Sequence, residues 1–474
     1  MDEVASLAVL AFPATFSQFF TILAQSIVAS FTGRYLGPDA LSACSLGIRF
    51  ISIFGVKVGV GMSAAIDTLC SQEHGRDHRS TRHGLYLLRC FICQFFCTIF
   101  CTILFVTAPV YFPQIFKEPI AHMAGRFVSI GTLYVFPIFL YNALCKMLQS
   151  LGLAVLPLIA TVVSAICCIG LNIIFIPLGI VGSVVALSIT AWIQLTAVAM
   201  LMLRNASSRH AIASSTPSWR EILDAAGMKE IVLLGLPSAA CVVFESLPFA
   251  AMIAFASVIG GIEASAYITV YNVIALLFTT SYGMSGAAAA RIGNALGANN
   301  PRLARNLVDV SILVTLFISL VNVGFFILFS RYLFRLFTTD EGVLERSSRL
   351  VALACFTHVV DCVQFVFQGI LSACGKNHIG MVLLMVNLIG ISIPTAALLV
   401  FLREWGADGL LIGLSSGLLM VIPCYLFVVY RMFDFEQLAR TASYSGVKRG
   451  EANADEEMDQ LEPSHEETTD IRRE

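Results

Sequence analysis

Twelve long apolar segments, each bounded by Gly, Pro or charged residues, run through the sequence. A helix needs about 20 apolar residues to cross the hydrocarbon core of a bilayer. No strand-like alternation competes with these segments, and in lipid a helix satisfies its own backbone hydrogen bonds. The sequence therefore predicts an all-α integral membrane protein with twelve transmembrane helices. They are expected at residues 5–31, 41–68, 84–112, 122–146, 154–177, 180–203, 228–258, 262–290, 307–330, 347–373, 379–402 and 408–431.

The composition excludes a soluble globular protein. Hydrophobic residues make up 57% of the 474 residues and charged residues only 13%, against about 25% charged residues in an average soluble domain. Acidic residues gather at the C-terminal end, where residues 434–474 hold 12 acids and 5 bases. We therefore expect an acidic, disordered cytosolic tail over residues 433–474. Because no basic arm is present, nucleic acid is not an expected partner.

The 14 cysteines lie within or beside the apolar segments, which excludes a secreted disulfide scaffold. Cys90, Cys93, Cys97 and Cys101 share one helical face and in principle could hold a soft metal. Packing against a neighbouring helix is the favoured interpretation, so no metal site is predicted. Motifs for nucleotide hydrolysis or covalent catalysis are also absent. The sequence thus predicts no enzyme and no cofactor, and active transport would have to draw on an ion gradient.

The positions of Lys and Arg predict the topology. If the short N-terminus is cytosolic, the cytosolic connections hold 14 basic residues and the opposite ones hold 8. Basic residues accumulate on the cytosolic side of membrane proteins, so both termini are expected in the cytosol. The first apolar segment is too long for a cleaved signal peptide and lacks its basic start, so it is expected to be a span. We expect a multi-pass protein of the plasma membrane or of a vacuolar or other endomembrane.

The second half of the chain repeats features of the first at a nearly constant offset. Gly61-Met-Ser recurs as Gly283-Met-Ser, and Gly75 recurs as Gly297 at the same offset. Pro13 recurs as Pro237 at almost the same offset. A polar, Ser-rich connection separates the two halves. The sequence therefore predicts an N-lobe of helices 1–6 over residues 1–203, a cytosolic linker over 204–227 and a C-lobe of helices 7–12 over 228–432.

An even number of spans in each half leaves the two lobes in the same orientation. This parallel-repeat arrangement is found in several secondary transporters, in which the substrate binds between the halves. Transport by rocking of one lobe against the other is therefore the leading hypothesis. The expected partners are a small-molecule substrate and membrane lipid, and the protein is expected to act as a monomer.

Few ionisable residues lie inside the predicted spans. Because placing a charge in the membrane costs free energy, each of them is expected to face a cavity or a partner. Glu245 lies near the middle of the seventh span and Asp361 midway along the tenth. Facing a cavity, the two acids could exchange a proton or jointly hold Na⁺, because burial and a neighbouring carboxylate both disfavour the ionised form. The alternative is an internal ion pair with Arg49 or Lys57 of the second span.

Other polar residues near these acids have two interpretations each. His358, one turn from Asp361, could tune that carboxylate, but a lone His in a span is more often a hydrogen-bonded packing residue. Asp67, at the cytosolic end of the second span, is expected to anchor the following loop through Arg76, Arg79 or Arg82. As such an anchor, Asp67 is assigned a structural or gating role. The repeated Pro13 and Pro237 are assigned the same kind of role, because a proline kinks a helix and a kink permits bending.

Aromatic residues could receive an apolar cation by stacking and cation–π contact. The alternative for each is simple packing or contact with lipid. The candidates are Phe244, Phe249, Tyr271, Phe365 and Phe367.

Each half of the sequence contains three further motifs. They are Pro13 with Gln18, Gly33 to Gly37, Gly61 to Gly75 with its Asp67-Thr-Leu-Cys-Ser-Gln72 core, Phe244-Glu245, Arg291 to Pro301, and Asp361 with Gln368-Gly-Ile-Leu and Gly375. Together they resemble the multidrug and toxic compound extrusion (MATE) family, in its eukaryotic form. The resemblance covers about residues 5–432. It implies a two-lobed antiporter of twelve helices that exports organic compounds in exchange for H⁺ or Na⁺.

The resemblance also implies residue roles. Glu245 and Asp361 match the acidic positions to which the family assigns cation coupling, and Gln18 matches a polar position on the substrate path. Asn272 stands where many eukaryotic members have a third Glu, and Val28 where many bacterial and archaeal members have an Asp. Coupling would therefore rest on the C-lobe pair alone. The residues expected along the substrate pathway are Gln18, Phe244, Tyr271, Asn272, Gln364 and Gln368.

Three alternatives to organic-cation export remain open. An organic-anion exporter would use Arg49 and Lys57 as partners for its substrate. A flippase for lipids or lipid-linked sugars would need a lateral opening. A membrane scaffold without transport would show no flux, and the intramembrane acids argue against it.

Overall fold

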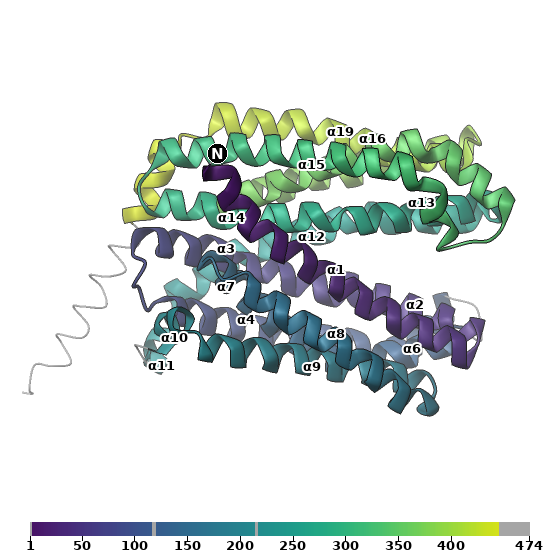
Figure 1. The fold of residues 1–474 in the computed structure, drawn as a ribbon, viewed down its shortest axis with the longest axis horizontal. Coiled ribbons are helices and arrows are strands. Elements are labelled where there is room, and N and C mark those ends of the chain that lie inside the picture. Colours follow the sequence, from purple (N-terminus) through teal and green to yellow (C-terminus); the bar gives the residue numbers. More distant parts are fainter. Residues whose placement is uncertain (1, 116–119, 214–216, 445–474) are drawn as a thin grey trace, which may run out of the picture.

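The computed structural model describes residues 2–115, 120–213 and 217–444, and the regular elements in this part of the chain are helical. Figure 1 shows one group of helices from the first half (purple to blue) beside a second group from the later half (green to yellow). The first half comprises α1 (Asp2–Leu36), α2 (Pro38–Ile51), η1 (Ser52–Val56), α3 (Lys57–Arg76), α4 (His83–Val106), α5 (Ala108–Ile115), α6 (Ile120–Ile130), α7 (Thr132–Ser150), α8 (Val155–Phe175), η2 (Ile176–Leu178) and α9 (Ile180–Arg204).

Two short helices follow before the second half. They are α10 (Ala206–Ala213) and α11 (Trp219–Ile222), which Figure 1 places at the same end of the molecule as the N-terminus. The second half comprises α12 (Ala225–Ile259), α13 (Gly261–Leu277), α14 (Thr279–Gly297), α15 (Pro301–Arg335), α16 (Glu341–Ala373), α17 (Asn377–Leu384), η3 (Met385–Ser392), α18 (Ile393–Ala397), η4 (Leu398–Leu402), α19 (Gly406–Phe427) and η5 (Val428–Met432).

The number of membrane-crossing helices agrees with the prediction. Within the described residues, 11 helical segments are long and apolar enough to span a bilayer, and α6 with α7 makes up to 12. The chain bends by 48° between these two helices, around Gly131. The predicted fold class, an all-α membrane protein of two six-helix lobes, is confirmed.

Each half has its own hydrophobic core, but the first helix of each half begins in the other lobe. Leu7, Leu10 and Ala11 of α1 belong to the core of the second half, and Ile231 and Ala239 of α12 belong to the core of the first. Figure 1 shows α1 starting among the green helices and crossing toward the blue ones. The two lobes are therefore joined by a symmetric exchange of helix ends.

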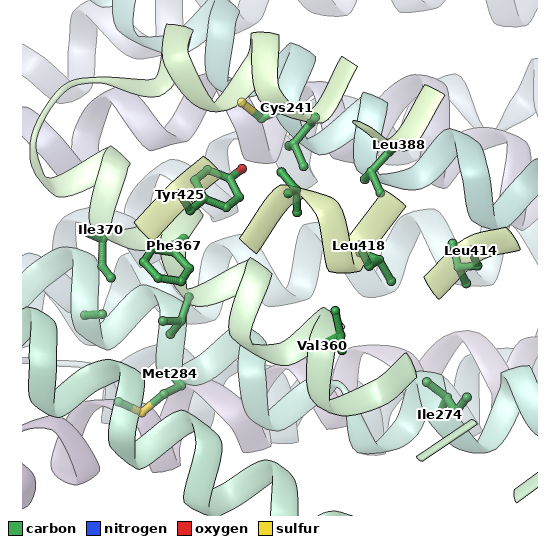
Figure 2. Close-up of a cluster of buried hydrophobic side chains, with 14 of the residues drawn as sticks. Cys241, Ile274, Met284, Val360, Phe367, Ile370, Leu388, Leu414, Leu418 and Tyr425 are labelled. Carbon is green, nitrogen blue, oxygen red and sulfur yellow. The ribbon is translucent and has the colours of Figure 1, made fainter. Parts of the chain in front are cut away.

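The core of the second half surrounds α16. Figure 2 shows Val360, Phe367 and Ile370 of this helix among Leu414, Leu418 and Tyr425 of α19. The rings of Phe367 and Tyr425 stack, with their centroids 5.4 Å apart and their planes 7° from parallel. This packing fixes the rotation of α16 about its axis, and with it the direction in which Asp361 points.

Repeated glycines lie at the contact between the lobes. Gly61 of α3 lies directly against the backbone of Ala239 in α12, and its counterpart Gly283 of α14 lies directly against Thr15 in α1. Thr15 and Ala239 are equivalent as well, because each is the second residue after a repeated proline. Any side chain at either glycine would overlap the facing helix. The sequence repeat is thus a pair of equivalent helix crossings, each of which needs a residue without a Cβ atom.

A second pair of glycines closes the end of the molecule where α3 and α14 finish, which we name the base. Gly75 lies against the carbonyl of Asn294, and Gly297 against the carbonyl of Gln72. Gln72 and Asn294 each stand three residues before the glycine of their own half, so these contacts are also equivalent. The Gln72 side chain donates a hydrogen bond to the Ala373 carbonyl at 2.9 Å. The lobes are therefore packed together, backbone against backbone, at the base.

Residues 445–474, most of the predicted acidic tail, lie outside the described residues, so its expected disorder stays a prediction. Before it, residues 435–444 are helical and help to line a cavity at the base with Gln72 and Gly375. In the predicted linker, α11 begins with a capping box formed by Ser218 and Glu221. Arg89 of α4 donates a hydrogen bond to the Glu221 carbonyl at 2.6 Å, which attaches this helix to the first half.

Candidate functional site

A cavity of about 300 Å³ lies between the two halves, next to the glycine crossings and farther from the base. One wall is formed by α1, η1, α3, α7 and α8, and the other by α12, α13, α14 and α16. The first wall carries neutral amides and hydroxyls, among them Gln18, Thr21, Gln25, Asn142 and Gln149. The second wall is aromatic, with Phe249, Tyr271, Phe278, Tyr282 and Phe365. The cavity thus joins a polar face and an aromatic face, each supplied by one half of the chain.

Both intramembrane acids line this cavity. Glu245 comes from the middle of α12 and is 5% exposed, and Asp361 comes from the middle of α16 and is 3% exposed. The Gln368 side chain donates a hydrogen bond to Glu245 Oε2 at 3.1 Å. Asp361 Oδ1 is buried and has no hydrogen-bond partner. Because a buried carboxylate oxygen normally has a partner, Asp361 presents an unsatisfied acceptor at the cavity.

Lys57 faces these acids from the other half. It is the first residue of α3, directly after the π-helical turn η1, and it lines the same cavity. Its ammonium donates a hydrogen bond to Ser246 Oγ, next to Glu245. Lys57 interacts electrostatically with both carboxylates, but among the described residues it forms no direct ion pair with either. The internal ion pair considered above is therefore not formed as a contact in this conformation.

Arg49 does not reach the acids. Its guanidinium lies over the ring of Tyr271, 5.6 Å from the centroid, in a cation–π contact between α2 and α13. His358 is fully buried and lies 3.4 Å from the Asn322 amide, which agrees with the packing interpretation. Neither residue lines the cavity.

The structure divides the residues expected along the substrate pathway into two groups. Gln18 and Tyr271 line the cavity. Gln368 lines a smaller cavity of about 70 Å³ that adjoins the first on the side of the base. Phe244, Asn272 and Gln364 do not line the central cavity in this conformation, so their place on the substrate pathway stays a prediction.

Helical geometry explains the displaced residues. The cavity-facing residues of α12 are Val242, Glu245 and Phe249, so Phe244 points about 100° away from Glu245 and packs on the core of the second half. The same rotation separates Asn272 from its neighbour Tyr271 on α13. On α16 the cavity-facing residues are Asp361 and Phe365, and Gln364 is fully buried on another face. Proximity in sequence to a lining residue did not place these side chains in the cavity.

The remaining aromatic and proline candidates divide in the same way. Phe249 and Phe365 line the cavity, whereas Phe367 is part of the core in Figure 2. Pro13 and Pro237 lie inside α1 and α12, which continue as single helices through them. Each proline is close to the residue that touches a repeated glycine, Thr15 or Ala239. The prolines therefore lie beside the crossings of the two lobes.

The expected partner of Asp67 is corrected by the structure. Its carboxylate pairs with Lys146 of α7, with Nζ to Oδ2 at 2.8 Å, whereas Arg76 pairs with Glu73. Asp67 is 3% exposed and lines the smaller cavity. The Lys146 ammonium also lies over the ring of Tyr282 at 6.0 Å. This buried ion pair forms part of the boundary between the two cavities.

Removal of either partner of this pair is expected to be costly. Lys146→Met leaves the Asp67 carboxylate buried and uncompensated, and Asp67→Asn does the same to the ammonium. Each change should destabilise the protein by roughly 3–5 kcal/mol, and the double variant should recover much of the loss. Thermal unfolding of the four purified proteins in detergent measures this cycle. Additive losses in the double variant would show that the two residues are not coupled.

Lys146 is a lining residue of the central cavity that the sequence reasoning missed. In the charge count that predicts the topology, Lys146 is one of the 14 basic residues of the cytosolic side. A signal for it exists, because Asn142, Lys146 and Gln149 are polar residues at helical spacing in an otherwise apolar segment. All three line the central cavity.

Comparisons with known proteins agree with this architecture. The family model described as MatE matches residues 13–177 and again residues 237–398, one match in each half. Human multidrug and toxin extrusion protein 1 is 26% identical over 432 residues, which cover 90% of this chain and 74% of that protein. Protein DETOXIFICATION 14 of Arabidopsis thaliana is 25% identical over 392 residues, which cover 81% of this chain and 79% of that protein.

Solved structures show the same fold. The crystal structure of the eukaryotic MATE transporter AtDTX14 superposes with a TM-score of 0.86 at 23% identity, and the match covers 94% of this chain and 99% of that one. An outward-facing MATE family transporter of the MOP superfamily gives a TM-score of 0.81 at 18% identity, covering 93% of this chain and 97% of that one. The chain therefore belongs to the multidrug and toxic compound extrusion family of membrane transporters, in its eukaryotic form.

Proposed function

We propose that the protein is a secondary active antiporter that exports organic cations or related xenobiotics in exchange for H⁺ or Na⁺. The observation that carries the proposal is the meeting of Glu245 and Asp361, from different helices, in one cavity between the lobes. The unsatisfied Asp361 oxygen supports binding of a proton or a cation there. The aromatic wall supports binding of an apolar cation, since cation–π contacts contribute about 0.5–2 kcal/mol each.

The exchange follows from competition for the two acids. Protonation or Na⁺ binding neutralises the site that attracts a cationic substrate, so each weakens the binding of the other by the same factor. In the state open to the outside, the site takes up the coupling ion and releases the substrate. In the state open to the cytosol, it releases the ion and takes up the substrate. If the base faces the cytosol, as the basic residues predict, its backbone contacts close the cytosolic side, which supports an outward-facing conformation.

The driving force depends on the charge of the substrate. Exchange of one monovalent cation for one proton moves no net charge, so only the pH difference acts. Each pH unit then provides about 1.4 kcal/mol, or tenfold accumulation. The membrane potential contributes only when the coupling ions carry more charge than the substrate.

Reconstituted vesicles test the proposal. They are loaded with a fluorescent organic cation and given a pH gradient alone, a Na⁺ gradient alone, or neither. We expect efflux against the substrate gradient with one of the two ions, with acidic pH or high Na⁺ on the side that receives the substrate. Flux that is the same under all three conditions would contradict antiport.

Export of organic anions is a second candidate, which the presence of Lys57 and Lys146 in the cavity favours. The Lys146 charge is already compensated by Asp67, so Lys57 would be the anion partner. Replacing the fluorescent cation with a dicarboxylate in the same vesicles discriminates between the two candidates. Gradient-driven flux of the dicarboxylate alone would favour anion export.

A further inference from the structure

The charges around the central cavity do not balance. In the described part of the chain, its Lys, Asp and Glu lining residues are Lys57, Lys146, Glu245 and Asp361. Lys146 forms its ion pair with Asp67 at 2.8 Å, so this pair carries no net charge. The single ammonium of Lys57 is then left with two carboxylates. With all of these groups ionised, the lining side chains and Asp67 sum to one negative unit; the Arg49 guanidinium over the Tyr271 ring is solvent-exposed and not part of the lining.

Lys57 is held in the cavity wall by the structure around it. Its ammonium donates a hydrogen bond to Ser246 Oγ, whose own hydroxyl donates to the Val242 carbonyl at 2.6 Å. The Lys57 ammonium also interacts electrostatically with Glu245 and Asp361, so an ammonium of one lobe lies within electrostatic range of the acids of the other. The π-helical turn η1 ends immediately before Lys57 and shifts the helical register at this point. Such turns are frequent at functional sites.

The repeat within the chain shows that this position does not require a lysine. Lys57 stands four residues before the repeated Gly61, and the residue four before its counterpart Gly283 is Thr279. Thr279 starts α14 as Lys57 starts α3, and it lines the same cavity. The fold therefore accepts a small neutral residue at the equivalent place, and the charge of Lys57 is an addition to the repeat.

We propose that Lys57 is a fixed counter-charge that leaves the cavity room for one exchangeable positive charge, so that the transporter selects organic monocations over dications. This inference rests on the proposed cation exchange and specifies its substrate class. One bound monocation, or one coupling proton, makes the site neutral. A second positive charge would enter a neutral site whose two carboxylates are buried, where charges interact more strongly than in solution. Without Lys57, two carboxylates would be available to compensate two charges.

The test compares two pyridinium compounds of similar size, one with a single quaternary nitrogen and one with two. Their efflux from vesicles is measured under a pH gradient and under a Na⁺ gradient for wild type, Lys57→Thr and Lys57→Arg. The Thr variant installs the residue of the second repeat, and the Arg variant keeps the charge. We expect wild type and Lys57→Arg to prefer the monocation by about tenfold or more, and Lys57→Thr to lower that preference by about tenfold or more.

Each outcome decides between the two proposals. If the monocation is exported under an ion gradient but Lys57→Thr keeps the wild-type preference, the role of Lys57 is refuted and the exchange stands. If Lys57→Arg behaves as Lys57→Thr does, shape rather than charge sets the preference, and the inference also fails. If wild type exports neither cation under either gradient, the proposed function itself fails.

A binding measurement keeps the test independent of transport rates. Calorimetric titration of the purified proteins with the two pyridinium compounds should show the same change in preference. If Lys57→Thr does not elute as a monodisperse protein, Lys57→Gln replaces it, because an amide can still donate to Ser246. Saturable binding of a dicarboxylate that is lost in the neutral variants would overturn the inference and make Lys57 an anion ligand.

Discussion

Asp361→Asn is expected to abolish gradient-driven efflux, and Glu245→Gln to reduce it severely. Each change removes a group that can take up a proton or hold a cation, while the amide keeps nearly the same shape. At an effective dielectric constant of about 20, a cation about 4 Å from a carboxylate gains about 4 kcal/mol. Losing part of that interaction should lower coupled transport by about 100-fold or more. Asp361 should be the more sensitive position, since its Oδ1 has no protein partner whereas Glu245 accepts from Gln368.

The measurement is initial efflux of a fluorescent cation from vesicles with and without an ion gradient. Glu345→Gln is a matched control, because Glu345 lies on the same helix as Asp361 but its side chain is 69% exposed and pairs with Arg349 one turn along the helix. The control should transport as wild type does. Undiminished gradient-driven efflux in both cavity variants would refute the assignment of the coupling site.

Gly297→Ala is expected to prevent closure of the base. The added methyl group would overlap the oxygen and carbon of the Gln72 carbonyl group across the lobe interface. These are backbone atoms, so they cannot rotate away as a side chain could. Overpacking of this kind costs roughly 1–3 kcal/mol, and the cost falls only on the state with a closed base. The equilibrium should therefore move toward the state with an open base, and steady transport should slow by about tenfold. Gly75→Ala should behave alike, because its contact with Asn294 is the equivalent one.

Hydrogen–deuterium exchange shows whether the base has opened. Backbone amides near residues 72–76 and 294–298 should exchange faster in Gly297→Ala than in wild type. Gly324→Ala provides the control, since Gly324 also lies inside a helix but has open space where a Cβ atom would be placed. Alanine there should leave both exchange and transport unchanged. Wild-type transport and exchange in Gly297→Ala would show that the base tolerates the extra methyl group.

The fold class could be predicted because lipid permits few solutions. A segment surrounded by lipid must form the hydrogen bonds of its backbone internally, because no water is present to form them. Apolar segments of sufficient length therefore become helices. The repeat was readable from Gly61, Gly75 and their counterparts because those positions tolerate no side chain in either half. The exchange of helix ends between the lobes could not be predicted from the sequence. Leu7 and Ile231 are ordinary apolar residues, and the residues they pack against lie in the other half of the chain.

The candidate site could be predicted only in part. Glu245 and Asp361 could be predicted because an acidic residue inside a span is costly and therefore rare. The structure places both in the cavity wall. Asn272 and Gln364 are expected on the substrate pathway, but the rotation of their helices turns both side chains away from the cavity wall. Lys146 was missed because its partner, Asp67, lies on another helix much earlier in the chain. Pairings of this kind depend on how the helices pack rather than on local sequence.

The sequence by itself determined that the chain crosses a membrane as helices, that it is built from two similar halves, and that two acids lie inside the membrane-spanning segments. These properties follow from the solvation of single side chains and from the backbone's need for hydrogen bonds. Only the tertiary structure decided that Lys57 shares a cavity with those acids and that Lys146 is compensated by Asp67. The physical reason is that the net charge of a site is a sum over helices, and the rotation and crossing of those helices are set by packing between lobes.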